Sequence, residues 1–432
     1  MKYDECREWL ENRRKKMGSV PGLTEVKKLM KEFGNPEKSL KILHIAGTNG
    51  KGSIGYLLEN VLAKSKIKTG RFLSPAVVDE REIILINGKM VPKTVWEKQL
   101  SEIIEVIASK KLTATAFEIE FVLALNIFKD MNCEIVILEC GMGGLLDATN
   151  AIDESLVDII SSISIDHCNF LGDTLKEISL HKFGILKKTS KNLVIAPQKE
   201  EIYDYLEGYL KDNKLKVNVI KCDNKDIKGK KIKKTPKPVQ IFDYKDYKEI
   251  RLSLLGEHQL DNAITVLEVL GVLKSLDIKI SEKAIYKTFE EALWPARFEI
   301  IEKDRTFILD GAHNSDAVER LFQNINLYFT KRNLIYLMGM YKDKAYEEVI
   351  NLCAKKAGAI VTVTPKDSAR AIDAFELGKV IKDVNANVTA ADSYYEALEM
   401  ARLLSDKKDV ILIFGSLSFM GEFRKMLNES GK

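Results

Sequence analysis

The sequence lacks several features that would place it in a specialised class of protein. Its 67 Lys and Arg residues nearly balance 63 Asp and Glu residues, and the formal net charge is only +4. So small a charge gives no support for a nucleic-acid partner, and any basic preference has to be local. No uncharged apolar run approaches the roughly 20 residues of a membrane span. The charged N-terminus, Met1 to Glu5, lacks the apolar core of a signal peptide, so we expect a cytoplasmic protein.

Cysteine is also scarce and widely spaced. None of the six cysteines forms a C-x-x-C pair, and no Cys/His cluster has zinc spacing. Cys133 and Cys140 flank or end an apolar run, where a free thiol usually acts as a small buried hydrophobe. This pattern indicates reduced thiols in a reducing compartment.

What the sequence does contain is a regular alternation of apolar runs and helical patterns. Such alternation predicts an α/β fold with a doubly wound, mostly parallel sheet. The 432 residues exceed one ordinary core, so we expect two domains. The strands expected in the first domain are 41–46, 134–140, 159–165 and 193–196.

A domain boundary is expected at the Trp-Pro-Ala-Arg run that ends at Arg297, because the alternation restarts after it. We predict an N-terminal ATP-binding domain over 1–295 and a smaller, Rossmann-like α/β domain over 296–432. The elements expected in the second domain are strands 306–309, 334–338, 359–364 and 410–414 and helices 317–329 and 394–404.

Residues 221–238 differ from the rest of the first domain. They are rich in Lys, contain two prolines and show no apolar periodicity. A solvated loop or hairpin is one interpretation, and a local nucleic-acid patch is the other. Because no aromatic residues lie among the lysines, we favour the solvated surface and expect no nucleic-acid partner.

The Gly-rich run 47–53 (GTNGKGS) follows a strand and precedes an amphipathic helix. Backbone N–H groups at such a helix start can hold a phosphate, and glycine lets the backbone approach it closely. Lys51 would neutralise the β- and γ-phosphates and Ser53 could contact Mg²⁺. The spacing departs from the common G-x-x-x-x-G-K-[ST] loop, because the first glycine lies three residues before Gly50 and Gly52 separates the lysine from the serine.

Other polar residues stand where predicted strands end. Glu139 is well placed for a metal, although its Gly-rich continuation would by itself be an ordinary turn. His167 follows a strand at the same sheet edge, so a metal or phosphate role competes evenly with a structural one. Lys182 on its own is typical of an exposed helical lysine. Residues 256–263 open a helix, where polar side chains are often caps, whereas the DGAHN run 310–314 faces the expected interdomain cleft.

Taken together, these motifs resemble those of the folylpolyglutamate synthase/dihydrofolate synthase family within the Mur ligase superfamily. The likeness extends from about the first twenty residues to the C-terminus. The motifs that carry it are GTNGKGS, Ser74-Pro75, Phe117-Glu118, GxGG-x-x-DATN, DH-x-x-x-LG, GEHQ-x-x-NA, DGAHN and GSL-x-x-x-GE.

The resemblance implies roles for individual residues. The catalytic group would comprise Lys51, His167 and Lys182, with Lys182 carbamylated beside the metals. Two Mg²⁺ sites would involve Ser53, Ser74, Glu139 and His167. The ATP contacts would be Asn49, Gly50, Lys51, Gly52, Ser53, Asn262, Arg297, Asp310 and His313. The acceptor substrate would meet Phe117, Glu118, Leu146, Asp147 and Ala148.

The implied reaction is ATP-dependent amide formation. A substrate carboxylate attacks the γ-phosphorus of ATP, and the amine of L-glutamate then displaces phosphate from the acyl phosphate. Such chemistry needs positioning and charge neutralisation, and domain closure would exclude water. The resemblance implies a folate acceptor and, as an additional activity, dihydropteroate. We expect a monomer, since no coiled-coil heptads are visible.

Four departures from the family pattern concern the acceptor. Ala76 follows Ser-Pro where His is usual, and Leu145 stands in place of Arg. His181 replaces Glu before the modified lysine, and Glu120-Phe121 lies where a Thr is often found. A ligase of the same architecture acting on a non-folate carboxylate is therefore the second hypothesis. A nucleotide-hydrolysing switch is the third, but it leaves DGAHN and GSL without a role.

Overall fold

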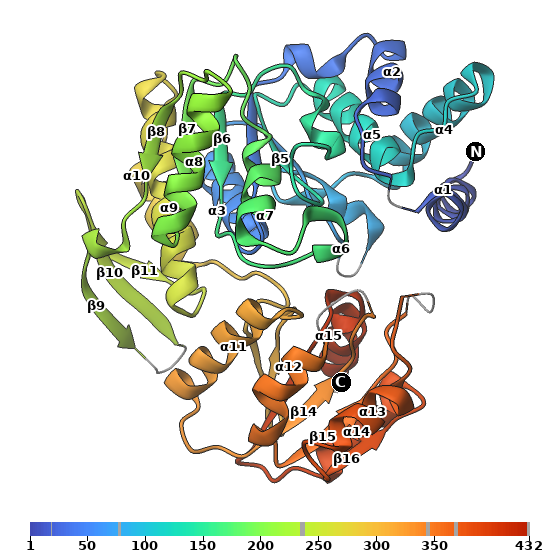
Figure 1. Ribbon diagram of the computed structural model, residues 1–432, viewed down its shortest axis with the longest axis vertical. Coiled ribbons are helices and arrows are strands. Elements are labelled where there is room, and N and C mark those ends of the chain that lie inside the picture. Colours follow the sequence, from blue (N-terminus) through green and yellow to red (C-terminus); the bar gives the residue numbers. More distant parts are fainter. Residues whose placement is uncertain (19, 77–78, 234–237, 343–345, 367–369, 430–432) are drawn as a thin grey trace.

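The computed structural model describes residues 1–18, 20–76, 79–233, 238–342, 346–366 and 370–429. Figure 1 shows two α/β bodies, with residues 1 to about 290 in the upper one and the remainder in the lower one. Both are built on a parallel-rich sheet with helices on its two faces, so the predicted fold class is confirmed. Within the described part of the chain, no helix is both long and apolar enough to cross a membrane.

The first sheet has eight strands in the order β4-β3-β2-β5-β1-β6-β7-β8. Its pairings from β2 through to β8 are parallel, while β3 pairs antiparallel with both β2 and β4. The central strands β1 and β5 are buried throughout, as expected for a sheet covered on both faces. The strands are β1 (Ile42–Ala46), β2 (Thr69–Phe72), β3 (Ile84–Ile86), β4 (Lys89–Met90), β5 (Ile135–Glu139), β6 (Val157–Ile160), β7 (Asn192–Ile195) and β8 (Asn218–Lys221).

Helices cover both faces because neighbouring residues of each strand point to opposite sides. Ile42 packs with the N-terminal helices, whereas Leu43 packs with the helices of the other face. The first face carries α1 (Tyr3–Met17), α2 (Thr24–Glu32), α4 (Lys93–Lys110), α5 (Ala116–Asp130), α7 (Leu175–Phe183) and α8 (Glu200–Asp212). The second face carries α3 (Lys51–Lys64), α9 (Glu257–Ser275) and α10 (Glu282–Glu290).

A small antiparallel sheet lies beside the first domain and contains much of the Lys-rich stretch. Its order is β11-β10-β9, formed by β9 (Ile227–Lys233), β10 (Val239–Tyr244) and β11 (Tyr247–Leu252). Strand β9 is an edge strand, and every residue after Ile227 in it is exposed. Lysines on an edge strand oppose pairing with another chain. Residues 234–237 of the Lys-rich stretch lie outside the described residues.

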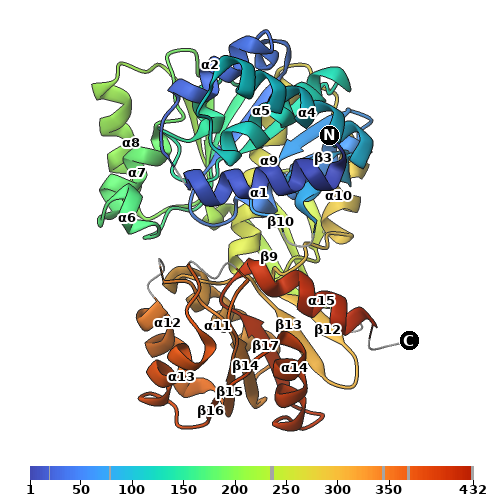
Figure 2. The same ribbon diagram turned by 90° about the vertical axis from the view of Figure 1, so that its right-hand side faces the viewer.

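The second sheet has the order β12-β13-β17-β14-β15-β16, with only β12 antiparallel to its neighbour. Two apolar clusters, one on each face, hold its helices. Figure 2 shows α15 at the end of this domain that faces the first domain. The elements are β12 (Glu299–Glu302), β13 (Thr306–Leu309), α11 (Ser315–Tyr328), β14 (Leu334–Met338), α12 (Tyr346–Cys353), β15 (Ala359–Thr362), α13 (Ala374–Lys382), β16 (Val388–Ala390), α14 (Tyr394–Leu403), β17 (Val410–Phe414) and α15 (Met420–Glu429).

One predicted strand, 159–165, is too long at its C-terminal end. Strand β6 stops at Ile160, because the chain then leaves the sheet to pair with the Gly-rich loop. The Ser162 carbonyl accepts from the Thr48 and Asn49 backbone N–H groups at 2.8 and 3.3 Å. Gln198 Nε2 donates to the Ser161 carbonyl at 2.8 Å. The residues after Ile160 therefore hydrogen-bond to the Gly-rich loop instead of continuing the strand.

Candidate active site

The Gly-rich loop joins β1 to α3, so its backbone N–H groups lie at a helix N-terminus. Gly50 caps this helix with φ 93°, and a Cβ at this position would overlap the Asn262 side chain. Glycine is needed here for both reasons. Lys51 Nζ donates to the carbonyls of Gly47 and Thr48 at 3.0 and 3.3 Å. The lysine thus folds back over its own loop, where a phosphate would lie.

Helix α9 supports the loop from behind. Gln259 Nε2 donates to Ser53 Oγ at 3.3 Å, and Asn262 Nδ2 donates to Gln259 Oε1 at 3.0 Å. All three side chains are buried. These bonds orient the Ser53 hydroxyl, and they explain why polar residues of the GEHQ-x-x-NA motif point inward from a helix start.

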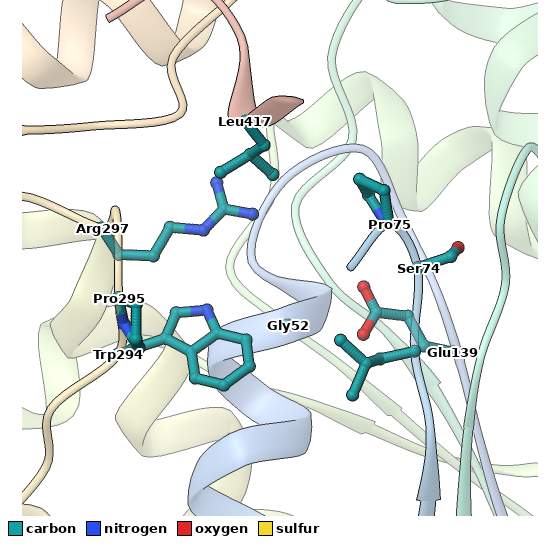
Figure 3. Close-up of a pocket in the computed structure, with 9 residues that line it drawn as sticks. Gly52, Ser74, Pro75, Glu139, Trp294, Pro295, Arg297 and Leu417 are labelled. Atoms are coloured by element: carbon teal, nitrogen blue, oxygen red, sulfur yellow. The ribbon is translucent and has the colours of Figure 1, made fainter. Parts of the chain in front are cut away.

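A pocket opens at the end of the loop and is lined by both domains. Figure 3 shows Trp294 and Arg297 on one side and Ser74 and Glu139 on the other, with Gly52 of α3 beneath. The remaining lining residues are Leu73, Pro75, Pro295 and Leu417. The predicted ATP and metal residues Gly52, Ser74, Glu139 and Arg297 are therefore gathered around one space.

Glu139 is the residue of this pocket best suited to a metal. Its side chain is buried, and its Oε2 atom accepts no hydrogen bond from the described residues. Burial raises the pKa of this carboxyl, and the positive charges of Arg71, Lys51 and Arg297 oppose that rise. A buried carboxylate oxygen with an open lone pair fits a hard cation such as Mg²⁺.

Among the described residues, no group of three or more His, Cys, Asp or Glu side chains is arranged to hold a metal by itself. Mg²⁺ is usually held by one or two carboxylates, substrate phosphates and water. His167 lies at the start of the short helix α6 (Cys168–Leu171), with φ 53°, an uncommon value for a residue other than glycine. Its Nε2 is 3.9 Å from Asp166 Oδ2.

Lys182 is buried on α7, contrary to the exposed lysine that its local sequence suggests. Burial lowers the pKa of its amine to about 7, and Lys51 adds to the effect, while Asp166 opposes it. A neutral amine is the form that reacts with carbon dioxide. The backbone ties this helix to the Gly-rich turn after β5, since the Leu145 N–H donates to the His181 carbonyl at 2.7 Å.

The second domain brings its polar residues to the same edge. Arg297 lines the pocket, and Asp310 accepts from the N–H groups of Phe298 and Ala312, both at 2.8 Å. Burial raises the pKa of Asp310 to about 6, against the effect of Arg297. His313 Nδ1 lies 2.8 Å from the Gly311 carbonyl and its Nε2 lies 3.9 Å from Asp166 Oδ2.

Hydrogen bonds join the domains directly. Asn49 Nδ2 of the loop donates to Asp316 Oδ2 at 2.7 Å, and Asn314 Nδ2 donates to Asp166 Oδ2 at 3.1 Å. Ser164 Oγ also donates to Asp316 Oδ2 at 3.3 Å. A carboxylate of the second domain therefore lies against the Gly-rich loop.

Two of the residues predicted to bind the acceptor substrate, Glu118 and Asp147, already accept hydrogen bonds within the protein. Glu118 accepts from Val26 N at 3.1 Å and from Thr115 N at 2.6 Å, so its carboxylate caps α5 and fastens α2. Asp147 accepts from Met142 N and Thr149 Oγ1 at 2.8 and 2.6 Å.

The other three predicted acceptor residues are apolar. Phe117 lies against Gly141, where a Cβ would come within 2.7 Å of its ring. Ala148 is in the core, whereas Leu146 is exposed. The structure thus places Phe117 and Leu146 near the turn, and it uses the carboxylates of Glu118 and Asp147 within the fold.

Sequence reasoning missed three residues at this site. Arg71 is fully buried between Glu59 and Glu139, Trp294 lines the pocket, and Asp316 contacts the loop. Arg71 and Asp316 carry no motif, because their roles depend on contacts across the fold. The signals that could have indicated them are an arginine inside a short strand-like run and an acid two residues after the DGAHN run.

Family models match both halves of the chain. The Mur ligase middle domain matches residues 45–270, and the Mur ligase glutamate ligase domain matches residues 296–417. These matches, together with the Gly-rich loop, the pocket between the domains and the two parallel-rich sheets, identify the chain as a Mur-type ligase. It is an ATP-dependent acid–amino-acid ligase, as the sequence predicts.

Individual relatives show to which family of Mur-type ligases the chain belongs. A dihydrofolate synthase/folylpolyglutamate synthase of Bacillus subtilis is 30% identical over 98% of this chain and 99% of its own length. A probable dihydrofolate synthetase of Schizosaccharomyces pombe is 28% identical, over 94% of this chain and 98% of its own. A crystal structure of Mycobacterium tuberculosis folylpolyglutamate synthase complexed with ADP and AMPPCP has a TM-score of 0.85 and 26% identity, covering 97% of this chain and 98% of that one. The chain belongs to the dihydrofolate synthase/folylpolyglutamate synthase family, and that prediction is confirmed.

Proposed function

We propose that the protein uses ATP to join L-glutamate to the carboxylate of a folate and, as an additional activity, to dihydropteroate. The observation that carries this proposal is the pocket lined by both domains, where Glu139 presents an open carboxylate oxygen opposite Arg297. The names of the Bacillus subtilis and Schizosaccharomyces pombe relatives supply the acceptor class. The bound ADP and AMPPCP of the Mycobacterium tuberculosis enzyme support ATP as the nucleotide.

The residues of the first domain would hold the phosphates. Backbone N–H groups from Asn49 to Ser53 would bind their oxygens, and Lys51 would turn from its own loop carbonyls toward the β- and γ-phosphates. The acceptor carboxylate attacks the γ-phosphorus and ADP leaves, which forms an acyl phosphate. The glutamate amine then attacks the acyl carbon, loses a proton and displaces inorganic phosphate.

The second domain would complete the nucleotide site. Arg297 lies at the pocket with its guanidinium near Leu417 (Figure 3), and it would neutralise charge from the side opposite Glu139. Asp310, His313 and Asn262 would contact the nucleotide around it. Closing the domains over ATP protects the acyl phosphate from water, which is the main competing nucleophile.

Ser53, Ser74, Glu139 and His167 would hold the divalent metal, directly or through the nucleotide, in two sites. When bound, the metal would neutralise phosphate charge and polarise the γ-phosphorus. The open Oε2 of Glu139 and the oriented hydroxyl of Ser53 fit such a cation.

Lys182 would act as a carbamate. A pKa of about 7 leaves a large neutral fraction at neutral pH, which is the form that carbon dioxide modifies. The carbamate would place a negative charge beside the metals. In this proposal Phe117 and Leu146 contact the acceptor directly, while Glu118, Asp147 and Ala148 shape its site. The enzyme would act as a cytoplasmic monomer.

The second candidate is a ligase for a non-folate carboxylate. Leu145 and Leu146 are exposed at the turn after β5, with relative exposures of 42% and 43%, and Leu145 stands where the family pattern usually has an arginine. The test is to incubate the protein with ATP, Mg²⁺, L-glutamate and either tetrahydrofolate or dihydropteroate, and to measure products by mass spectrometry. We expect a product heavier by one glutamyl unit and one ADP per amide. ADP formation with other carboxylates but neither pterin would assign the second function.

A further inference from the structure

Arg71 is a fully buried arginine that lies beside the pocket without belonging to any site motif. It stands in β2, and its side chain has 0% exposure. Burying a guanidinium is costly unless opposite charge and hydrogen-bond acceptors surround it. The groups around Arg71 therefore show what the fold keeps it for.

Two carboxylates flank the guanidinium. Arg71 Nη1 lies 3.5 Å from Glu59 Oε2, and Nη2 lies 3.8 Å from Glu139 Oε2. Glu59 is held from behind by the Gly88 N–H, which donates to its Oε1 at 2.7 Å. The shortest bond that Arg71 makes runs from Nη2 to the Gly52 carbonyl, at 2.9 Å. That carbonyl is in the first turn of α3, directly after Lys51.

Trp294 packs on the guanidinium from the side of the interdomain linker. The Arg71 Cζ atom lies 4.7 Å from the centre of the indole ring, within the range of a cation–π interaction. Tyr56 of α3 contacts the same indole, with ring centres 5.0 Å apart. Trp294 is three positions before Arg297, so the contact reaches the segment that leads into the second domain.

The helix has glycines where Arg71 needs room. A Cβ on Gly55 would lie 2.9 Å from Arg71 Nε, closer than such atoms approach in folded proteins. A Cβ on Gly52 would meet Trp294 Nε1 at 3.5 Å and Glu139 Oε1 at 3.8 Å. An alanine at Gly55 would consequently displace the guanidinium without changing any charge.

We propose that Arg71 is a positioning residue that orients Glu139 and the first turn of α3 relative to each other, and that links them to the interdomain linker through Trp294. At 3.8 Å the Arg71 guanidinium attracts the Glu139 carboxylate without donating a hydrogen bond to it, so the lone pairs of the buried Oε2 stay available to a cation. The Gly52 bond and the indole contact extend the contacts of Arg71 beyond Glu59, to the first turn of α3 and to the segment before Arg297. The inference rests on the proposed metal role of Glu139.

The first test measures metal affinity apart from turnover. Mn²⁺ binding in the presence of ADP is followed by electron paramagnetic resonance for wild type, Arg71→Lys and Glu139→Gln. Arg71→Lys keeps the positive charge but removes the planar guanidinium with its several N–H donors. We therefore expect Mn²⁺ affinity to fall about 10–100-fold, as for other residues that orient a metal ligand without binding the metal themselves. Affinity within a factor of two of wild type in a folded Arg71→Lys protein would overturn the inference.

Gly55→Ala keeps the test decisive if the lysine variant does not fold. It should weaken Mn²⁺ binding in the same direction, because it displaces the guanidinium. Gly208→Ala is the matched control, since a Cβ on this helical glycine meets nothing within 4 Å. Equal affinities for Gly55→Ala and Gly208→Ala would count against the inference.

Tryptophan fluorescence provides a readout that a merely structural arginine would not affect. The emission of Trp294 is obtained as the difference between wild type and Trp294→Phe. Adding Mg²⁺ to the ADP complex should change this emission in wild type and leave it unchanged in Arg71→Lys. A full-sized change in the variant would contradict the coupling. If Glu139→Gln and Arg71→Lys both bind Mn²⁺ normally, the metal role of Glu139 fails as well, whereas a defect in Glu139→Gln alone removes only the inference about Arg71.

Discussion

The proposed nucleotide end and the proposed acceptor end of the site differ in what their polar atoms do. At the nucleotide end, Glu139 Oε2 accepts no hydrogen bond from the described residues, and Lys51 donates to carbonyls of its own loop. At the acceptor end, the carboxylates of Glu118 and Asp147 are engaged by the chain itself. The nucleotide end is thus built with open or exchangeable polar groups, whereas the acceptor end relies on apolar side chains and shape.

Lys51→Ala should produce the largest effect if the nucleotide end works as described. Loss of one positive group aimed at the transferred phosphoryl group should lower kcat by about 10²–10³-fold, as for other transition-state donors. Steady-state kinetics with a coupled ADP assay measure this. Lys64→Ala, at the other end of the same helix, removes only an exposed pair with Glu291 and should keep its kcat. Near-normal turnover of Lys51→Ala would remove the lysine from the mechanism.

Glu118→Ala tests the acceptor end, where the structure indicates a folding role. The variant loses a buried capping box and the bond to Val26 N, so the free energy of unfolding should fall by about 2–4 kcal/mol. Urea denaturation measures the change. Glu102→Ala, exposed on the neighbouring α4, should stay within about 0.5 kcal/mol. A higher KM for the acceptor at unchanged stability would instead make Glu118 a substrate contact.

The buried amine of Lys182 should make the free energy of unfolding depend on pH. Its pKa is about 7 in the folded protein and 10.5 in the reference state, so the unfolded chain binds more protons between these values. Its contribution to the free energy of unfolding therefore rises with pH across that window, by up to about 1.4 kcal/mol per pH unit. Denaturant titrations of wild type and Lys182→Met between pH 7 and 9.5, in buffers freed of carbon dioxide so that Lys182 stays an unmodified amine, isolate this contribution. Parallel curves for the two proteins would place an ordinary, solvated amine at Lys182.

Asp316→Asn should have the smallest effect and a favourable one. It removes a partly exposed negative charge from beside Asn49, where phosphate would bind. Relief of this repulsion should tighten ADP binding about three- to tenfold, which corresponds to roughly 1 kcal/mol. Isothermal titration calorimetry measures it. Asp304→Asn removes an exposed charge paired with Arg305 and should leave ADP affinity unchanged. Weaker binding by Asp316→Asn would show that this carboxylate assists the nucleotide.

The features that could be predicted from the sequence are those that a local pattern of residues determines. The buried strands 42–46 and 135–139 lie where their apolar runs indicate, and the Gly-rich loop lies between strand and helix as predicted. Local pattern is sufficient there because burial on both faces and backbone torsions are encoded within a few residues.

Other features depend on contacts between distant segments. Strand β2 has an arginine among its four residues, and its contacts with Glu59, Glu139, Gly52 and Trp294 explain it. The Lys182 sequence suggests an exposed helix, yet tertiary packing buries it. Glu118 and Asp147 were predicted for the substrate from a resemblance, which does not reveal that the fold occupies their oxygens.

The proposed mechanism transfers one oxygen atom of the acceptor carboxylate to inorganic phosphate. Isotope labelling tests this transfer directly. The acceptor is prepared with ¹⁸O in its carboxylate and incubated with the protein, ATP, Mg²⁺ and L-glutamate, and the inorganic phosphate is analysed by mass spectrometry. If the nucleotide end phosphorylates the carboxylate held at the acceptor end, each phosphate released carries one labelled oxygen from the acceptor. Phosphate without label, formed at the same rate, would show hydrolysis by water and contradict the account.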